Sequence, residues 1–281
     1  MNSSAEKNPG LRLPFFSGKN RVHGKRKPLK FSSTVWATFS FLFLGLLWES
    51  AARYSGWSAD IFPGPVRVFI SMWELCLTGV LLKHTVASLF RVTIGFYLAV
   101  IFGIPLGILL GRWVTGRQIL NPLIQFLRPI SPLAWIPIAM LWFGIGDKPA
   151  IFLIFLASFF PLVVSITAAV SSINPVYFQV ASNFNLNRRE TIIKIVIPAV
   201  VPAIITALRI TITIAWLVVV AAEMIAVRSG LGYLILDSRN ALRMDYVMDG
   251  MIIIGIIGLC LDSLMRRMGK IESARWGLFS R

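Results

Sequence analysis

Six apolar runs divide this chain into alternating membrane and aqueous segments. Among them, Phe31 to Trp48, Val92 to Gly111 and residues 149–187 contain no Asp, Glu, Lys or Arg. A helix that crosses a membrane needs about 20 apolar residues. The pattern therefore predicts an all-α polytopic membrane protein with six transmembrane helices, near 31–54, 85–111, 119–143, 150–172, 192–222 and 246–265.

Two of these runs carry helix-modifying residues. In the second run, Gly103, Gly107 and Gly111 form two overlapping GxxxG steps, which permit close helix approach, either inside the molecule or at a dimer seam. The third run contains four prolines, which leave backbone carbonyls without their helical partners. It is either a broken helix beside a transport pathway or a kinked packing helix. The prolines are Pro122, Pro129, Pro132 and Pro137.

The segments between the runs carry their own signals. Pro63-Gly64-Pro65 predicts a turn, followed by a short amphipathic helix within the external segment 55–84. A second external segment is expected over 223–246, and it begins with Glu223.

The charge distribution predicts the orientation of the chain. Only 14% of the residues are charged, against about a quarter in soluble domains, while the net charge is +16. Lys and Arg crowd the two ends and alternate loops, so the charge indicates membrane orientation and no nucleic-acid partner. More than twice as many lie on the inner side if both termini are cytoplasmic. We expect a basic disordered tail over 1–34, which anionic membrane lipid would attract, a transmembrane domain over 35–268 and a second basic tail over 269–281.

A polar segment, residues 174–191, interrupts the apolar pattern. Asn174 is a good N-cap and Pro175 suits a first helical position. One face of a short helix is then predicted from the spacing of Tyr177, Val180, Ala181 and Phe184. Asn183 and Asn185 tolerate the left-handed conformation that ends helices. Asn187 and Glu190 predict a capping box, which begins the next helix.

This segment resembles the cytoplasmic coupling loop, or EAA loop, of bacterial ABC-importer permeases. The family pattern is Glu-Ala-Ala, three residues, Gly, nine residues and Ile-x-Leu-Pro. Its spacing matches Gln179-Val180-Ala181, Asn185 and Ile195 to Pro198 without a gap. Gln179 and Asn185 depart from the family's Glu and Gly. Asn tolerates the turn, whereas Gln179 removes a charge and puts any ionic contact there in doubt.

The resemblance extends over most of 35–268 and is closest to permeases for nitrate, taurine, aliphatic sulfonates and bicarbonate. It rests on Ala87 to Arg91, Gly103 to Gly107, Leu127 to Pro137, Leu141 to Gly144, Val220 to Met224 and Gly230 to Tyr233. It implies a type I importer permease fold in the inner membrane, two permease subunits that are usually identical, two cytoplasmic ATP-binding subunits and an extracytoplasmic substrate-binding protein. ATP and Mg would belong to the ATPase, with no cofactor in this chain. The implied coupling residues are Tyr177, Gln179, Val180, Ala181, Phe184, Asn185 and Pro198.

Other classes of function find less support in the sequence. The chain has no HExxH, GxSxG or GxxxxGK[ST] motif, and Cys76 and Cys260 lack metal-ligand spacing. An ion-gradient-driven secondary transporter is the alternative, but it would need carboxylates at mid-membrane. Glu49, Asp249 and Asp262 all lie near the ends of the predicted spans. A membrane enzyme would need clustered His, Asp or Cys.

Three arginines lie within the predicted spans, where charge is costly and usually faces a cavity or a partner. They are Arg91, near the outer end of its span and able to extend to the membrane surface, Arg128 and Arg209. A guanidinium group binds sulfonate-like oxygens through two parallel hydrogen bonds. These arginines, with Ser131 and Trp135, are therefore the candidate substrate path. A structural pairing is the alternative for Arg209, with Glu223 or a backbone carbonyl as its partner.

Overall fold

The structure, a computed structural model, describes residues 33–54, 56–58 and 60–275, and all regular elements among them are helical. The chain divides into two compact units, Met1–Leu46 and Leu47–Arg281, and helix α1 (Ser33–Tyr54) crosses the boundary between them. The predicted N-terminal tail falls almost wholly outside the described residues. All other helices belong to the second unit.

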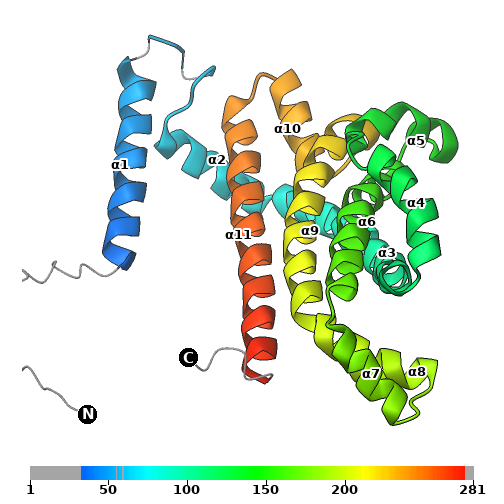
Figure 1. Ribbon diagram of the computed structural model, residues 1–281. Helices are drawn as coiled ribbons and strands as arrows, with labels where there is room; N and C mark the ends of the chain where they lie inside the picture. Colours follow the sequence, from blue (N-terminus) through cyan, green and yellow to red (C-terminus); the bar gives the residue numbers. More distant parts are fainter. Residues whose placement is uncertain (1–32, 55, 59, 276–281) are drawn as a thin grey trace, which may run out of the picture. The chain divides into compact units, whose positions relative to one another are not determined.

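Four long helices form the frame of this unit (Figure 1): α3 (Val80–Arg112), α6 (Asp147–Ser171), α9 (Ile197–Ala226) and α11 (Met244–Arg275). By length and composition, each can cross a membrane, as can a fifth, bent pair of helices. The prediction of an all-α polytopic membrane protein is therefore confirmed. The count of six spans and the position of the termini stay predictions.

The bent pair occupies the proline-rich third run. Helix α4 (Val114–Leu127) is followed by the 3-10 turn η1 (Pro132–Trp135) and α5 (Ile136–Phe143), with a bend of 86° between them. Pro129 and Pro132 lie at the break, where they lack the N–H groups that would continue the helix. The run is thus a broken helix, and its place beside a transport pathway stays a prediction.

Close packing of α3 on α6 explains the glycine repeat. A Cβ atom at Gly107 would lie 2.8 Å from Cβ of Ile166, and one at Gly103 would lie 3.2 Å from Leu162. Thr167 also donates a hydrogen bond from Oγ1 to the Gly107 carbonyl at 3.2 Å. The repeat therefore serves packing inside the chain.

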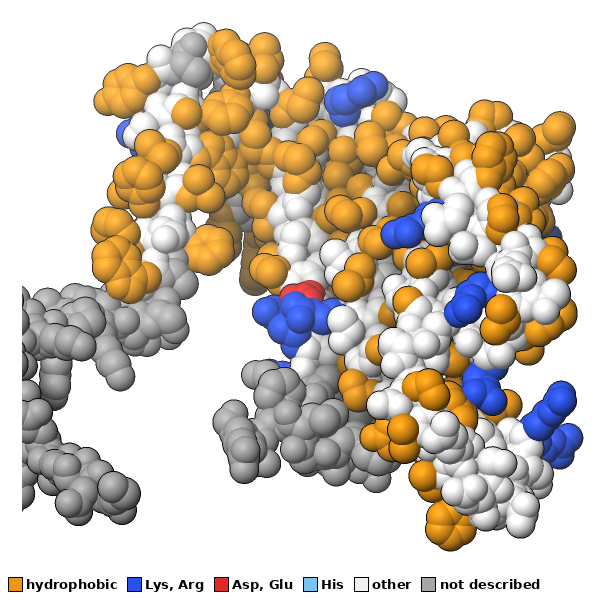
Figure 2. Space-filling view, in the orientation of Figure 1, with side chains coloured by type: hydrophobic (Ala, Val, Ile, Leu, Met, Phe, Trp, Pro, Cys, Tyr) orange, Lys and Arg blue, Asp and Glu red, His pale blue; other side chains and the backbone are white. Residues whose placement is uncertain are grey.

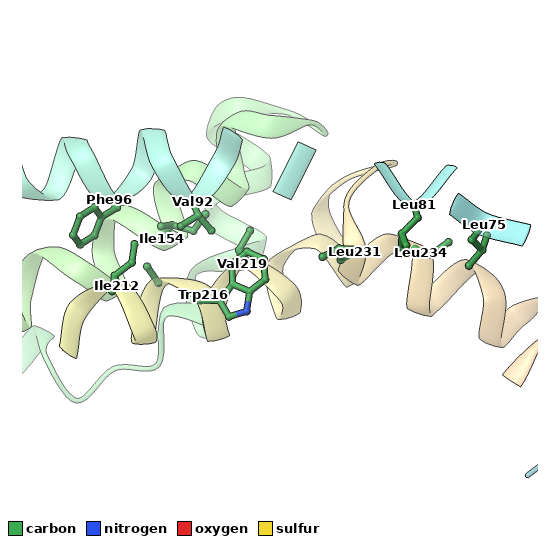
Figure 3. Close-up of a cluster of buried hydrophobic side chains, with 11 residues drawn as sticks. Leu75, Leu81, Val92, Phe96, Ile154, Ile212, Trp216, Val219, Leu231 and Leu234 are labelled. Carbon is green, nitrogen blue, oxygen red and sulfur yellow. The ribbon is translucent and has the colours of Figure 1, made fainter. Parts of the chain in front are cut away.

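The largest apolar cluster among the described residues has buried members from five helices, α2 (Pro65–Leu77), α3, α6, α9 and α10 (Leu231–Asn240) (Figure 3). Val92 and Phe96 of α3 pack with Ile154 of α6 and with Ile212 and Trp216 of α9. The same cluster continues to Leu231 and Leu234 of α10. Trp216 also donates from Nε1 to the Ile254 carbonyl at 3.0 Å, which ties α11 to α9.

The external segments differ in part from the prediction. Helix α2 follows the predicted turn and buries Val68, Ser71 and Leu75. The expectation that Glu223 begins an external loop is wrong, because α9 continues to Ala226 and Glu223 is buried within it. Helix α11 also continues to Arg275, past the predicted end at 265.

Candidate functional site

Near the centre of the coupling segment, residues 174–191, one helix ends in a fully hydrogen-bonded C-terminal cap. Helix α7 (Pro175–Asn183) begins where Oδ1 of Asn174 accepts a hydrogen bond from the Val176 N–H at 3.0 Å. It ends because Asn185 is left-handed, with φ 51°, and the Leu186 N–H reaches back to the Ala181 carbonyl at 2.9 Å. This is a Schellman motif. It accounts for Asn where the family pattern has Gly.

The next helix begins at once. Asn187 accepts from the Glu190 N–H at 2.8 Å, and Glu190 accepts from the Asn187 N–H at 3.0 Å. This capping box, as predicted, begins α8 (Arg188–Thr191). A π-helical turn, η2 (Ile192–Val196), then leads into α9, which has Pro198 in its first turn. Such turns commonly redirect a helix.

The outer surface of α7 and its C-cap carries no charged residue and exposes large apolar side chains among polar ones. Tyr177, Val180 and Phe184 expose 58%, 44% and 75% of their surfaces, whereas Ala181 is buried. The predicted single face is therefore divided between surface and interior. Gln179 and Asn185 are also exposed. We name Tyr177, Val180 and Phe184 the coupling patch; in Figure 2, hydrophobic side chains protrude at the end of the molecule formed by α7 and α8.

The inner surface of α7 contacts the membrane helices through a residue that sequence reasoning missed. Phe178 packs against the apolar cluster formed by the ends of α6 and α9. The guanidinium of Arg112, the last residue of α3, lies 4.0 Å from the centre of the Phe178 ring. Phe178 therefore joins α7 to the adjacent ends of α3, α6 and α9. The available signal was the position of Phe178 three residues before Ala181.

A second candidate site, which is polar and buried, lies around Arg91 at the opposite end of these helices. This side chain is only 2% exposed, and all three of its guanidinium nitrogens are engaged. Two contact Oδ1 of Asp147 at 2.7 and 2.8 Å, and Nη1 donates to Oε1 of Glu223 at 2.6 Å. The remaining contacts are with the Ser229 carbonyl and hydroxyl, at 2.8 and 2.5 Å.

Glu223 connects this cation to the start of α10. Its Oε2 accepts from the Ser88 hydroxyl at 2.8 Å and from the Gly232 N–H at 3.0 Å. Gly230, with φ 105°, must be glycine because a Cβ atom there would overlap the Glu223 carboxylate. The cluster thus joins α3, α6, α9 and α10 at one end of the molecule.

Two expectations about the arginines are corrected by these contacts. Arg91 does not extend to the surface, since its guanidinium group is 2% exposed and makes four hydrogen bonds and a further ion-pair contact inside the protein. Arg209 does not pair with Glu223 or a carbonyl; its Nε donates to Oδ1 of Asp262 at 2.7 Å. Glu223 is the partner of Arg91 instead.

Two of the predicted path residues line a common cavity. A cavity of about 180 Å³ beside the helix break is lined by Arg128 and Trp135, and Ser131 lies between them in sequence. Ala157 and Pro161 of α6 also line it. Because Pro161 has no N–H, the Ala157 carbonyl lacks its helical donor. Arg128 is thus the one cationic residue that lines this cavity, and neither Arg91 nor Arg209 is among its lining residues.

Comparison with known sequences places this arrangement among transport proteins. Residues 103–275 match the family model described as binding-protein-dependent transport system inner membrane component. A putative ABC transporter permease of Methanocaldococcus jannaschii is 45% identical over 79% of this chain and 84% of its own length. The taurine transport system permease TauC of Escherichia coli is 33% identical over 89% of this chain and 94% of its own. A putative aliphatic sulfonates transport permease, SsuC of Bacillus subtilis, is 33% identical over 80% of this chain and 81% of its own length.

The fold also resembles a solved transporter. An inward-facing structure of the MetNI methionine ABC transporter contains a chain that matches 72% of this chain and 98% of its own length. The TM-score is 0.61 at 15% sequence identity. This likeness concerns the fold alone.

Proposed function

This chain belongs to the family of binding-protein-dependent transport system inner membrane components, and we propose that it is the permease of an importer for a small sulfonate. It is a multi-pass inner-membrane translocation subunit of an ABC importer and not an enzyme. Two copies of the chain would pair with two cytoplasmic ATPase subunits, which bind the ATP and Mg. An extracytoplasmic binding protein would deliver the substrate.

The names of the relatives support a small oxyanion as the substrate. Those that name a substrate include permeases for taurine, for aliphatic sulfonates and for nitrate, the last from Leptolyngbya laminosa and 37% identical. Taurine and the alkanesulfonates share a sulfonate group. We therefore place taurine or an aliphatic sulfonate first, and nitrate or bicarbonate next.

The cavity beside the helix break is the proposed substrate contact. A guanidinium group such as that of Arg128 can bind two sulfonate oxygens at once. Trp135 supplies an apolar wall for the alkyl part, and the Ala157 carbonyl can accept from an ammonium group such as that of taurine. Arg91, with its donors occupied, holds the helices together in this proposal and does not contact substrate.

The coupling patch is the main structural support for the proposed contact with the ATPase. An uncharged helix surface with exposed apolar side chains, at a membrane-protein loop, is suited to a groove on a soluble partner. Burying a Phe side chain contributes about 1.5–3 kcal/mol, and Tyr is enriched at binding hot spots, so Phe184 and Tyr177 can anchor the contact. Arg112 and Phe178 then connect the docked helix to the spans. A rigid-body movement of the ATPase would be passed to the membrane helices in this way.

The experiment reconstitutes the permease with its ATPase and binding protein in liposomes and measures the ATPase rate. The panel is taurine, alkanesulfonates, nitrate and bicarbonate. One sulfonate should stimulate hydrolysis, and Phe184→Asp should abolish the stimulation. Leu242→Asp is the matched control, because Leu242 is 74% exposed at the turn between α10 and α11. Equal stimulation of ATP hydrolysis in the wild type and in Phe184→Asp would refute the coupling assignment. Stimulation by nitrate alone would refute the assignment of a sulfonate as substrate.

A further inference from the structure

Three charged side chains meet on the surface where α9 and α11 lie side by side. Arg209 binds Oδ1 of Asp262 at 2.7 Å, and Arg266 binds Oδ2 of the same carboxylate at 2.8 Å. The side chains of the two arginines are 44% and 48% exposed. In Figure 2, a small acidic and basic patch lies on this face along α11, beside hydrophobic side chains.

The helices that carry this cluster also expose apolar side chains. The exposed side chains of Leu259 and Leu264 lie on the same helix as Asp262, and Ile210 follows Arg209 in α9. Charges in such a setting are costly unless they reach the interfacial layer of the membrane. Their depth therefore decides what they can contact.

Helix length places the cluster near one membrane boundary. Asp262 lies about five turns from the start of α11 at Met244, or about 27 Å along the helix. Arg209 lies about 25 Å from the end of α9 at Ala226. The hydrocarbon layer is about 30 Å thick, so both reach the far boundary. That boundary is on the side of α7 and α8 (Figure 1), which is cytoplasmic in the proposed function.

The cluster has a net positive charge and N–H donors that its one carboxylate does not use. Two guanidinium groups share one carboxylate, and the exposed Arg267 is adjacent. Each guanidinium has five N–H donors. Among the described residues, Asp262 is the only ion-pair partner of Arg209 and of Arg266. The remaining donors can bind a further oxyanion.

We propose that Arg209 and Arg266 bind the phosphodiester of an anionic phospholipid in the cytoplasmic leaflet. The acyl chains would lie along Leu259 and neighbouring apolar side chains, which a free anion cannot use. A free sulfonate shares the headgroup chemistry and is the competing source. The proposal rests on the proposed function only for the orientation of the chain.

The test is native mass spectrometry of the assembled permease–ATPase complex, titrated with phosphatidylglycerol and with phosphatidylcholine. The wild type should bind phosphatidylglycerol more tightly. One basic residue near a membrane surface changes affinity for anionic lipid by about fivefold, so the double variant Arg209→Gln/Arg266→Gln should lose about 25-fold. Arg67→Gln is the matched control, because Arg67 is 41% exposed and binds Asp60 at 2.7 Å. It should bind lipid as the wild type does.

The variant Asp262→Asn should change the affinity for phosphatidylglycerol in the opposite direction. Removing the competing carboxylate should tighten phosphatidylglycerol binding about fivefold, a gain that a poorly folded protein would not show. Equal binding of the two lipids, or no change in either variant, would overturn the proposal. Methanesulfonate binding that depends on the two arginines, without a preference for phosphatidylglycerol, would assign the cluster to a free anion and also overturn it. Association with the ATPase, seen in the same spectra, tests the proposed function separately.

Discussion

Replacing Glu223 by Gln tests the buried cluster around Arg91. The substitution keeps the side-chain volume and removes the charge from a group with no exposed surface. Glu223 now accepts hydrogen bonds from Arg91, Ser88 and Gly232. Breaking a buried ion pair costs about 3–5 kcal/mol. We expect about 3 kcal/mol, because Asp147 and the Ser229 oxygens still bind the guanidinium.

A double-mutant cycle separates the pair from its surroundings. Arg91→Met, Glu223→Gln and the double variant should give a coupling free energy of about 2 kcal/mol, within the range for buried contacts. The control cycle uses Arg67 and Asp60, whose closest atoms are also 2.7 Å apart but whose side chains are 41% and 71% exposed. Such surface pairs contribute about 0–1 kcal/mol.

The assay is reversible unfolding of the purified protein in mixed micelles, with the helical circular dichroism signal as readout. A free energy of unfolding for Glu223→Gln within about 0.5 kcal/mol of the wild type, which is the usual range for surface substitutions, would refute the reasoning. So would equal coupling in the two cycles. Either result would mean that the Arg91 contacts do not hold the ends of the helices together.

Three further changes follow from the packing and the sites. Gly107→Val should lower the free energy of unfolding by about 1–3 kcal/mol in the same assay, because its side chain would overlap Ile166, whereas Gly255→Val meets open space and should leave it unchanged. Arg112→Gln should weaken substrate-stimulated ATPase without preventing assembly, because it removes a cation–π contact of about 1 kcal/mol; unchanged stimulation would exclude this link. Arg128→Gln should raise the substrate concentration for half-maximal stimulation about tenfold, the loss expected for one charged hydrogen bond; an unchanged value would remove the cavity from the path.

Local features of this fold could be predicted from the sequence. Apolar length located α3, α6, α9 and α11 to within several residues at most ends. The stop after α7 and the start of α8 followed from Asn185, Asn187 and Glu190, because capping depends on neighbouring residues. The proline break in the third run was one of two open interpretations.

Long-range pairing could not be predicted in the same way. Arg91 and Glu223 lie far apart in the sequence, and Glu223 was assigned to a loop because a charge usually ends an apolar run. Its carboxylate is tolerated in the interior because three donors converge on it. The Arg209 partner was missed for the same reason. On a helix as short as α7, periodicity alone did not separate the buried Ala181 from the exposed coupling patch.

Site-specific photo-crosslinking at position 184 tests the central claim most directly. A benzoylphenylalanine at Phe184, in the complete complex in native membranes, should form an adduct with the ATPase. The same probe at Leu242, equally exposed at the other end of the molecule, should form none. An ATPase adduct at 184 alone would support docking through the coupling patch. No adduct at 184, or equal adducts at both positions, would contradict it.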